Sequence, residues 1–187
     1  MLALDDGLML FHGSYTEVKT PDLEKCRPGK DFGRGFYLTT SLEQARSFSR
    51  LSARKHNRLA AGEGTGEAGV VSAFRFSASK ELAFFSFEHA DEEWLHFVAT
   101  NRRTGLFADQ IAAFANYDVI AGKIANDQTA RTLQLYVSGA YGNPGSPQAD
   151  GIAVSVLLPN RLENQYCFRS ARALSSLQFV ESSVCHG

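Results

Sequence analysis

The chain has 187 residues, and its 19 Lys and Arg against 20 Asp and Glu give a formal net charge of −1. This balance excludes binding to nucleic acid or anionic membranes through overall charge and leaves only a local basic patch. The 44% of hydrophobic and 21% of charged residues are typical of a globular protein, and the length predicts one domain over residues 1–187.

The apolar runs and the cysteines indicate where the protein resides. No apolar run approaches the roughly 18 residues that span a bilayer, and Asp5 and Asp6 stand where a secretory signal needs apolar residues. Cys26, Cys167 and Cys185 form no C-x-x-C pair and are odd in number, which suits a reducing compartment. We therefore expect a cytoplasmic protein with no membrane partner.

The first half of the chain predicts strands, one helix and a linker. Runs of apolar, aromatic and β-branched residues predict three strands, at 8–12, 36–40 and 70–76. Ser41 opens a helix after the second strand, because Gln44 three residues later completes a capping box. The Gly-rich segment 60–69 precedes a strand rather than following one, so we interpret it as a linker and not as a dinucleotide-binding loop.

The second half of the chain predicts a less regular set of elements. Strands are expected at 117–124, 166–168 and 177–180, a helix from Asp91 or Glu92, and a small helix at 171–174. Residues 128–138 fit a helix and a strand equally, and the Gly- and Pro-rich segment 139–151 predicts a loop. The irregular alternation of strands and helices predicts an α+β fold, and fourteen Phe residues predict an aromatic-rich core.

Three polar side chains interrupt the predicted strands and are candidates for a functional site. His12 closes an apolar strand just before Gly13, Tyr37 follows the two glycines of segment 33–35, and Gln165 enters a strand of Tyr, Cys and Phe. A glycine-rich approach leaves the backbone open to a ligand. Each residue also fits a structural role, for example a satisfied strand histidine or a core tyrosine. Taken together, they lead us to predict that the three side chains converge on one cleft.

The sequence around these residues resembles the ADP-ribosyltransferase superfamily. Segments 10–14 (Leu-Phe-His-Gly-Ser), 31–40 (Asp-Phe-Gly-Arg-Gly-Phe-Tyr-Leu-Thr-Thr) and 164–168 (Asn-Gln-Tyr-Cys-Phe) look like its three signature strands. The chain is closer still to a bacterial family assigned to that superfamily, which adds a Trp-Leu-x-Phe…Asn-Arg helix and a Tyr-Asp…Ile-Ala-x-Asp stretch. The matching segments here are 94–102 and 117–127. These blocks cover almost the whole chain in the same order, and segment 31–40 is the most specific.

The resemblance implies an ADP-ribosyltransferase-like fold, a split two-sheet β core with flanking helices that clamps NAD+ between the sheets. His12 would hydrogen-bond the ribose on the adenosine side, the Gly13 backbone would hold the nicotinamide carboxamide, and Tyr37 would stack on the nicotinamide ring. Gln165 would orient the nicotinamide ribose, and Arg34 would contact a phosphate. The residues implied to bind NAD+ are His12, Gly13, Ser14, Arg34, Gly35 and Tyr37.

The position of Gln165 usually carries Glu in the superfamily. Cleavage of the nicotinamide–ribose bond builds positive charge on the ribose, and a neutral amide positions a hydroxyl without supplying a full charge. Glu163 lies two residues earlier on the same strand face and Asp127 is a second acid, although a solvated strand edge and a turn would explain them equally. The candidate catalytic residues are Gln165, Glu163, Asp127 and Tyr37. A Gln165→Glu exchange is expected to preserve or raise the rate.

The function implied is NAD+-dependent ADP-ribosyl transfer to a macromolecule, protein or nucleic acid, by a bacterial toxin with a small antitoxin protein as partner. Two alternatives stay open: an NAD+ glycohydrolase, and an NAD+-binding or interaction module without catalysis. NAD+ would serve as the substrate. No metal is expected, since we assign His89 and His96 to no metal-binding motif.

Overall fold

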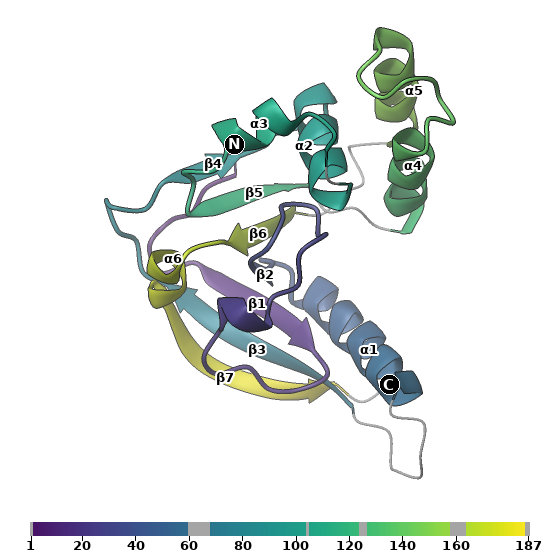
Figure 1. Ribbon diagram of the computed structural model, residues 1–187. Coiled ribbons are helices and arrows are strands. Elements are labelled where there is room, and N and C mark those ends of the chain that lie inside the picture. The colour runs from purple at the N-terminus through teal and green to yellow at the C-terminus, as the bar shows by residue number, and fades with distance from the viewer. Residues whose placement is uncertain (1, 60–67, 104, 124–126, 158–163, 186–187) are drawn as a thin grey trace.

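A computed structural model of the chain describes residues 2–59, 68–103, 105–123, 127–157 and 164–185. These residues form an α+β arrangement with two β-sheets and six α-helices (Figure 1). One sheet has three strands in the order β1-β3-β7, and the other has four in the order β2-β6-β5-β4. The α+β class predicted from the sequence is confirmed.

The three-stranded sheet is antiparallel throughout. It consists of β1 (Met9–Ser14), the central β3 (Gly69–Phe76) and β7 (Leu177–Cys185). Helix α1 (Leu42–Leu59) lies against β1 and β3 (Figure 1). Its buried side chains Ala45, Ser49 and Ala53 recur every four residues, and their small size lets the helix lie close to the strands.

Helices α2 (Glu92–Arg102) and α3 (Ala108–Ala113) lie on one side of the four-stranded sheet (Figure 1). Its strands are β2 (Phe36–Leu38), β6 (Asn164–Phe168), β5 (Val119–Lys123) and β4 (Phe84–Ser86), of which only the pair β4–β5 is parallel. Helices α4 (Asp127–Val137) and α5 (Pro147–Leu157) pack against each other and against α2. Two short elements complete the described chain: a 3-10 helix η1 (Leu23–Lys25) and α6 (Ala171–Ser175).

The two sheets meet where β1 runs beside the end of β2. Phe11 and Thr39 exchange two backbone hydrogen bonds there, with N···O distances of 2.8 and 3.0 Å. The core between the sheets is aromatic, with Phe36, Phe74 and Phe168 among its buried members. The expected aromatic-rich core is therefore present, and β1, β2 and β6 converge at one place.

Several elements differ from the sequence-based expectations. The ambiguous segment 128–138 is helical in α4. A loop was expected over 139–151, and this prediction is wrong from Pro147 on, because α5 begins there. Proline suits the first turn of a helix, and the Ser146 hydroxyl accepts a hydrogen bond from the Ala149 amide at 3.3 Å. The last strand is longer than 177–180. Elements β4 and α3 were not expected at all.

Two further sequence-based expectations concern the linker and the membrane. Residues 60–67 of the expected linker 60–69 lie outside the described residues. Within the described part of the chain, no helix is both long and apolar enough to cross a bilayer.

Candidate functional site

A cleft of about 680 Å³ opens beside the junction of the two sheets. His12 from β1, Tyr37 from β2 and Gln165 from β6 all line it. The strand registers explain this arrangement, because Tyr37 lies opposite Cys167 and Gln165 is two residues away on the same face of β6. The predicted convergence of the three side chains on one cleft is confirmed.

His12 is held in one tautomer by the neighbouring strand. Its Nδ1 lies 2.8 Å from the backbone oxygen of Tyr37 and donates a hydrogen bond to it, which leaves Nε2 as an acceptor in the neutral ring. Burial lowers the pKa of His12 below 6.5, and the hydrogen bond to Tyr37 only partly opposes this effect. The ring centroid lies 4.4 Å from that of Phe36. His12 is therefore a neutral, fixed hydrogen-bond acceptor at pH 7.

Gly13, Ser14 and Gly35 also line the cleft. A Cβ atom on Gly13 would lie 2.1 Å from the backbone oxygen of Ala45, and one on Gly35 would lie 2.4 Å from Sγ of Cys167. Both distances are far shorter than any real contact, so the glycines are required for β1 to approach α1 and for the chain before β2 to approach β6. Packing thus explains these glycines, whereas the sequence suggested an approach left open to a ligand.

Tyr37 uses its hydroxyl to shape the loop before β2. The hydroxyl donates to the Gly33 carbonyl at 2.7 Å and accepts from the Phe32 amide at 2.9 Å. Burial raises the pKa of Tyr37, with a further contribution from nearby Cys167, so the phenol stays neutral. The same burial raises the pKa of the Cys167 thiol to about 12, so this cysteine is a core residue rather than a nucleophile.

Gln165 contacts an acid that the sequence analysis did not single out. Its Nε2 donates to Oδ2 of Asp31 at 3.3 Å, and both side chains are buried, 5% and 8% exposed. The other oxygen of Asp31 accepts from Nε and Nη2 of Arg102, at 2.8 and 2.6 Å. All three side chains line the cleft. Gln165, Asp31 and Arg102 therefore form a connected chain from amide to carboxylate to guanidinium.

Helix α2 fixes the loop that carries Asp31. The Asn101 side-chain amide donates to the backbone oxygen of Asp31 at 3.1 Å, next to the ion pair made by Arg102. The two sequence blocks 31–40 and 101–102, which the resemblance singled out separately, are thus in direct contact. The signal for Asp31 was present in the sequence, since it opens the most specific block and the Asn-Arg pair belongs to the same pattern.

Gln44 also lines the cleft, although the sequence pattern indicated only a role in capping the helix. Ser41 caps α1 as expected, its hydroxyl accepting from the Gln44 amide at 3.2 Å. The Gln44 side chain does not close the capping box, because its Oε1 accepts from the Thr39 hydroxyl at 2.5 Å. Its Nε2 is buried and has no hydrogen-bond partner within the described residues. The cleft wall therefore contains an unsatisfied donor.

Arg34 is not among the residues that line the cleft, and the structure does not describe the side chains of Glu163 and Asp127. Arg34 is absent from the lining, because its guanidinium donates to the Leu23 carbonyl at 3.0 Å and pairs with Glu24 at 3.4 Å. Glu163 lies outside the described residues. Asp127 begins α4, and its side chain lies outside the described part of the structure.

Charged side chains of both signs line the cleft in place of Arg34. The cations are Lys19, Lys25, Arg27, Lys30 and Arg102, and the acids are Glu17, Asp22 and Asp31. Most of the cations come from the segment between β1 and β2, around the 3-10 helix η1. The excess of positive charge suits an anionic ligand such as a pyrophosphate.

Comparison with known proteins places the chain in a family. No curated protein and no solved structure gives a match. The sequence model of the family described as "Protein of unknown function (DUF3990)" matches residues 8–179, which span every strand that lines the cleft. The chain therefore belongs to the DUF3990 family.

Proposed function

We propose that the protein binds NAD+ in this cleft and transfers its ADP-ribose to a macromolecular acceptor. The bond between nicotinamide and ribose breaks, the acceptor nucleophile bonds to the ribose carbon, and nicotinamide leaves. The observation that carries the proposal is that His12, Tyr37 and Gln165, from three strands of two sheets, line one cleft. These are the positions that the resemblance to ADP-ribosyltransferases assigns to NAD+, and the proposed fold is the split two-sheet core of that superfamily.

The dimensions and polar groups of the cleft support a nucleotide ligand. Its volume of about 680 Å³ is in the range of about 300–1,000 Å³ typical of small-molecule sites. Nε2 of His12 is a ready acceptor for a ribose hydroxyl, since Nδ1 is already engaged with Tyr37. The unsatisfied Nε2 of Gln44 is a donor that a ligand oxygen would satisfy. The lining cations, with Lys30 and Arg27 among them, would face the pyrophosphate.

Tyr37 and Gln165 would act on the reacting half of NAD+. The Tyr37 ring would stack on nicotinamide while its hydroxyl keeps the loop in place. Because the Gln165 amide nitrogen is engaged with Asp31, its Oε1 is the atom left to accept from the ribose 2′-hydroxyl.

Asp31 would supply the negative charge that Gln165 lacks. As the ribose gains positive charge, the buried carboxylate would stabilise it through the polarised Gln165 amide. Arg102 offsets part of this charge and fixes the orientation of the carboxylate. Glu163 and Asp127 are kept as further proposed acids.

The biological setting proposed is a bacterial cytoplasm, with a toxin role and a small antitoxin as partner. This part rests on the resemblance alone. The three cysteines are free thiols in the structure, as in a reducing compartment.

The test is release of nicotinamide from NAD+ by the purified protein, together with calorimetric NAD+ binding. The His12→Asn variant is expected to lose both, whereas His89→Asn, at an exposed position outside the cleft lining, is expected to keep them. Labelled NAD+ offered to DNA, RNA and lysate proteins then separates a transferase from a glycohydrolase. Binding without release would favour the non-catalytic module, and absence of both would refute the proposal.

A further inference from the structure

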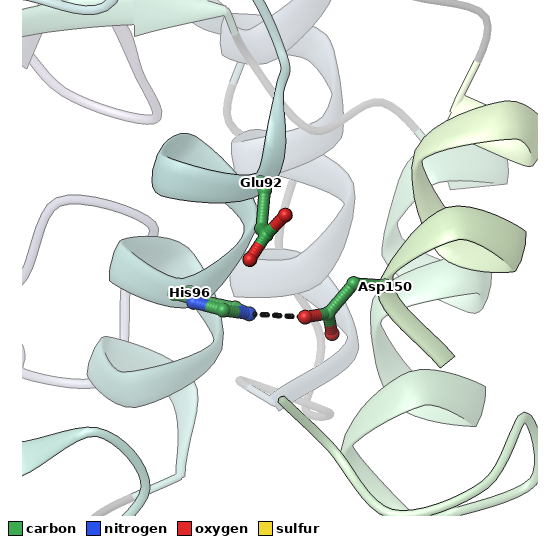
Figure 2. Close-up of side chains that lie close together, drawn as sticks. All are labelled: Glu92, His96 and Asp150. Atoms are coloured by element: carbon green, nitrogen blue, oxygen red, sulfur yellow. Dashed lines mark hydrogen bonds and ion pairs between the residues drawn. The ribbon is translucent and has the colours of Figure 1, made fainter. Parts of the chain in front are cut away.

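A second polar cluster lies between α2 and α5, away from the cleft. Figure 2 shows Glu92 and His96 from α2 and Asp150 from α5 pointing toward one another. One ligand atom from each residue lies within 4.8 Å of the others, and Nε2 of His96 is 2.9 Å from Oδ2 of Asp150. The signal in the sequence was the spacing of Glu92 and His96, which places them one helical turn apart on one face.

The two buried members of the cluster are held in place by a surrounding shell. His96 is 6% and Asp150 2% exposed. Oδ1 of Asp150 accepts from the Tyr136 hydroxyl at 2.5 Å and from the Gly145 amide at 3.1 Å. Nδ1 of His96 lies 3.3 Å from the side-chain amide of Gln110. Such outer contacts orient ligands in metal sites.

The charge of the cluster is unbalanced. The hydrogen-bond partners found for the Asp150 carboxylate in the described chain are Tyr136, Gly145 and His96, and none carries a permanent charge. Glu92 is exposed and has no hydrogen bond or ion pair among the described residues. Two carboxylates thus face one imidazole, and no Lys or Arg of the described chain pairs with them.

We propose that Glu92, His96 and Asp150 bind a divalent transition-metal ion of the Zn²⁺ class. One imidazole nitrogen with two carboxylate oxygens suits Zn²⁺ and its first-row neighbours better than Mg²⁺ or Ca²⁺, which prefer oxygen ligands alone. Ligand bonds of about 2.0–2.2 Å place tetrahedral ligand atoms about 3.4 Å apart. The exposed Glu92 closes that gap by swinging inward, and the His96–Asp150 pair opens slightly.

The site keeps a fourth position open to solvent. A hollow of about 440 Å³ is lined by Glu92, Glu93, His96 and Gln110, and none of its lining residues belongs to the NAD+ cleft. To ligate through Nε2, neutral His96 moves its proton to Nδ1, and a half-turn of the Gln110 amide presents an oxygen to accept it. Three protein ligands with an open position are the pattern of an accessible zinc site. The inference does not depend on the proposed function.

The test uses the full chain without a histidine tag, stripped with a chelator and titrated with ZnCl2. We expect one Zn²⁺ per chain by calorimetry and elemental analysis, with a melting temperature that rises with Zn²⁺ concentration. Glu92→Gln is expected to weaken binding at least about tenfold. Glu93→Gln changes an acid in the same hollow outside the cluster, so it is the matched control and keeps the wild-type affinity.

Glu92→Gln is the decisive variant because its side chain is exposed and its loss leaves the buried shell intact. His96→Gln, checked for folding by circular dichroism, is expected to abolish binding. The proposal is overturned if no stoichiometric Zn²⁺ binds, or if Glu92→Gln binds it as tightly as the wild type. MgCl2 at the same concentration is expected to leave the melting temperature unchanged.

Discussion

The side-chain amide of Gln165 donates a hydrogen bond to the carboxylate of Asp31 at 3.3 Å. In the function proposed above, this strand position would usually carry Glu; the chain has an amide there, and an acid from the loop before β2 contacts it. Arg102 binds the other oxygen of the same carboxylate. The contact changes what an exchange at position 165 should do.

Gln165→Glu would place a second carboxylate against Asp31 in a buried wall. Like charges at this separation raise the pKa of one partner and disfavour the ionised pair. We now expect this variant to release nicotinamide more slowly than wild type, in contrast to the expectation from the sequence alone. Gln165→Ala is expected to lower the rate by about 10²–10³, as for a lost transition-state hydrogen bond.

The double variant Asp31→Asn/Gln165→Glu exchanges amide and carboxylate and restores a single negative charge. Its rate of nicotinamide release should exceed that of Gln165→Glu alone. Equal rates in the two variants would show that Asp31 does not act through Gln165. Urea unfolding of each variant separates a loss of rate from a loss of fold.

Two variants of Tyr37 separate the role of its ring from the role of its hydroxyl. Tyr37→Phe keeps the stacking face but leaves the Phe32 amide and the Gly33 carbonyl without their partner. Two lost hydrogen bonds are expected to lower the free energy of unfolding by about 1–3 kcal/mol. Tyr37→Ala should in addition weaken NAD+ binding, since stacking contributes about 1 kcal/mol beyond burial. Calorimetry on both variants checks this, and equal NAD+ affinity in Tyr37→Ala and Tyr37→Phe would exclude stacking.

Local pattern was sufficient to predict the strands that line the cleft. In β2 and β6, residues 36–38 and 166–168 are short runs of aromatic and other apolar residues, a signal that does not depend on distant contacts. His12, Tyr37 and Gln165 could be singled out because they are polar residues within these apolar runs. Their convergence followed from the resemblance and from the polar interruptions together.

The features that the sequence did not predict depend on contacts between residues far apart in the chain or on tertiary packing. Asp31 is linked to Gln165 across 134 residues of sequence and to Arg102 across 71, and its own neighbours in sequence look like an ordinary turn. Helix α3 is only six residues long and follows Phe107, which has a positive φ of 44° and makes no side-chain cap. The phosphate contact of Arg34 stays a prediction, but its ion pair with Glu24 of η1 could not be foreseen from local pattern. Tertiary context decided each of these features.

Gly13 should not tolerate a methyl group. In Gly13→Ala the new Cβ would lie 2.1 Å from the Ala45 carbonyl oxygen and 2.8 Å from the Ser49 amide nitrogen, so α1 must move away from β1. Overpacking of this kind costs about 1–3 kcal/mol or more. Gly151→Ala in α5 is the control, because nothing lies within 4 Å of its Cβ position and alanine favours a helix. Urea midpoints should fall for the first variant and stay equal or rise for the second.

The lowered pKa of His12 leads to a prediction of how stability and NAD+ binding depend on pH. Its pKa in the folded protein lies below 6.5, mainly because burial disfavours the charged ring. The unfolded chain therefore binds more protons than the folded one between the folded pKa and 6.5, and stability falls as the pH drops through that window. Protonation would also remove the Nε2 acceptor that we assign to the ribose, so NAD+ affinity should fall over the same range.

The measurement is the free energy of unfolding from urea titrations at steps below pH 6.5, with NAD+ affinity measured in parallel. His12→Asn should remove the His12 contribution to the pH dependence of stability. A second decline is expected to remain in the variant near and below pH 3.8, because Asp118 has a lowered pKa. Burial alone would raise the pKa of Asp118, but hydrogen bonds from Ser170 and Ala83 and the Arg172 ion pair outweigh it. Its carboxylate therefore stabilises the fold above pH 3.8, and this stabilisation is lost on acidification. A pH dependence below 6.5 that is identical in wild type and His12→Asn would contradict the assignment of His12 as a partly buried neutral acceptor.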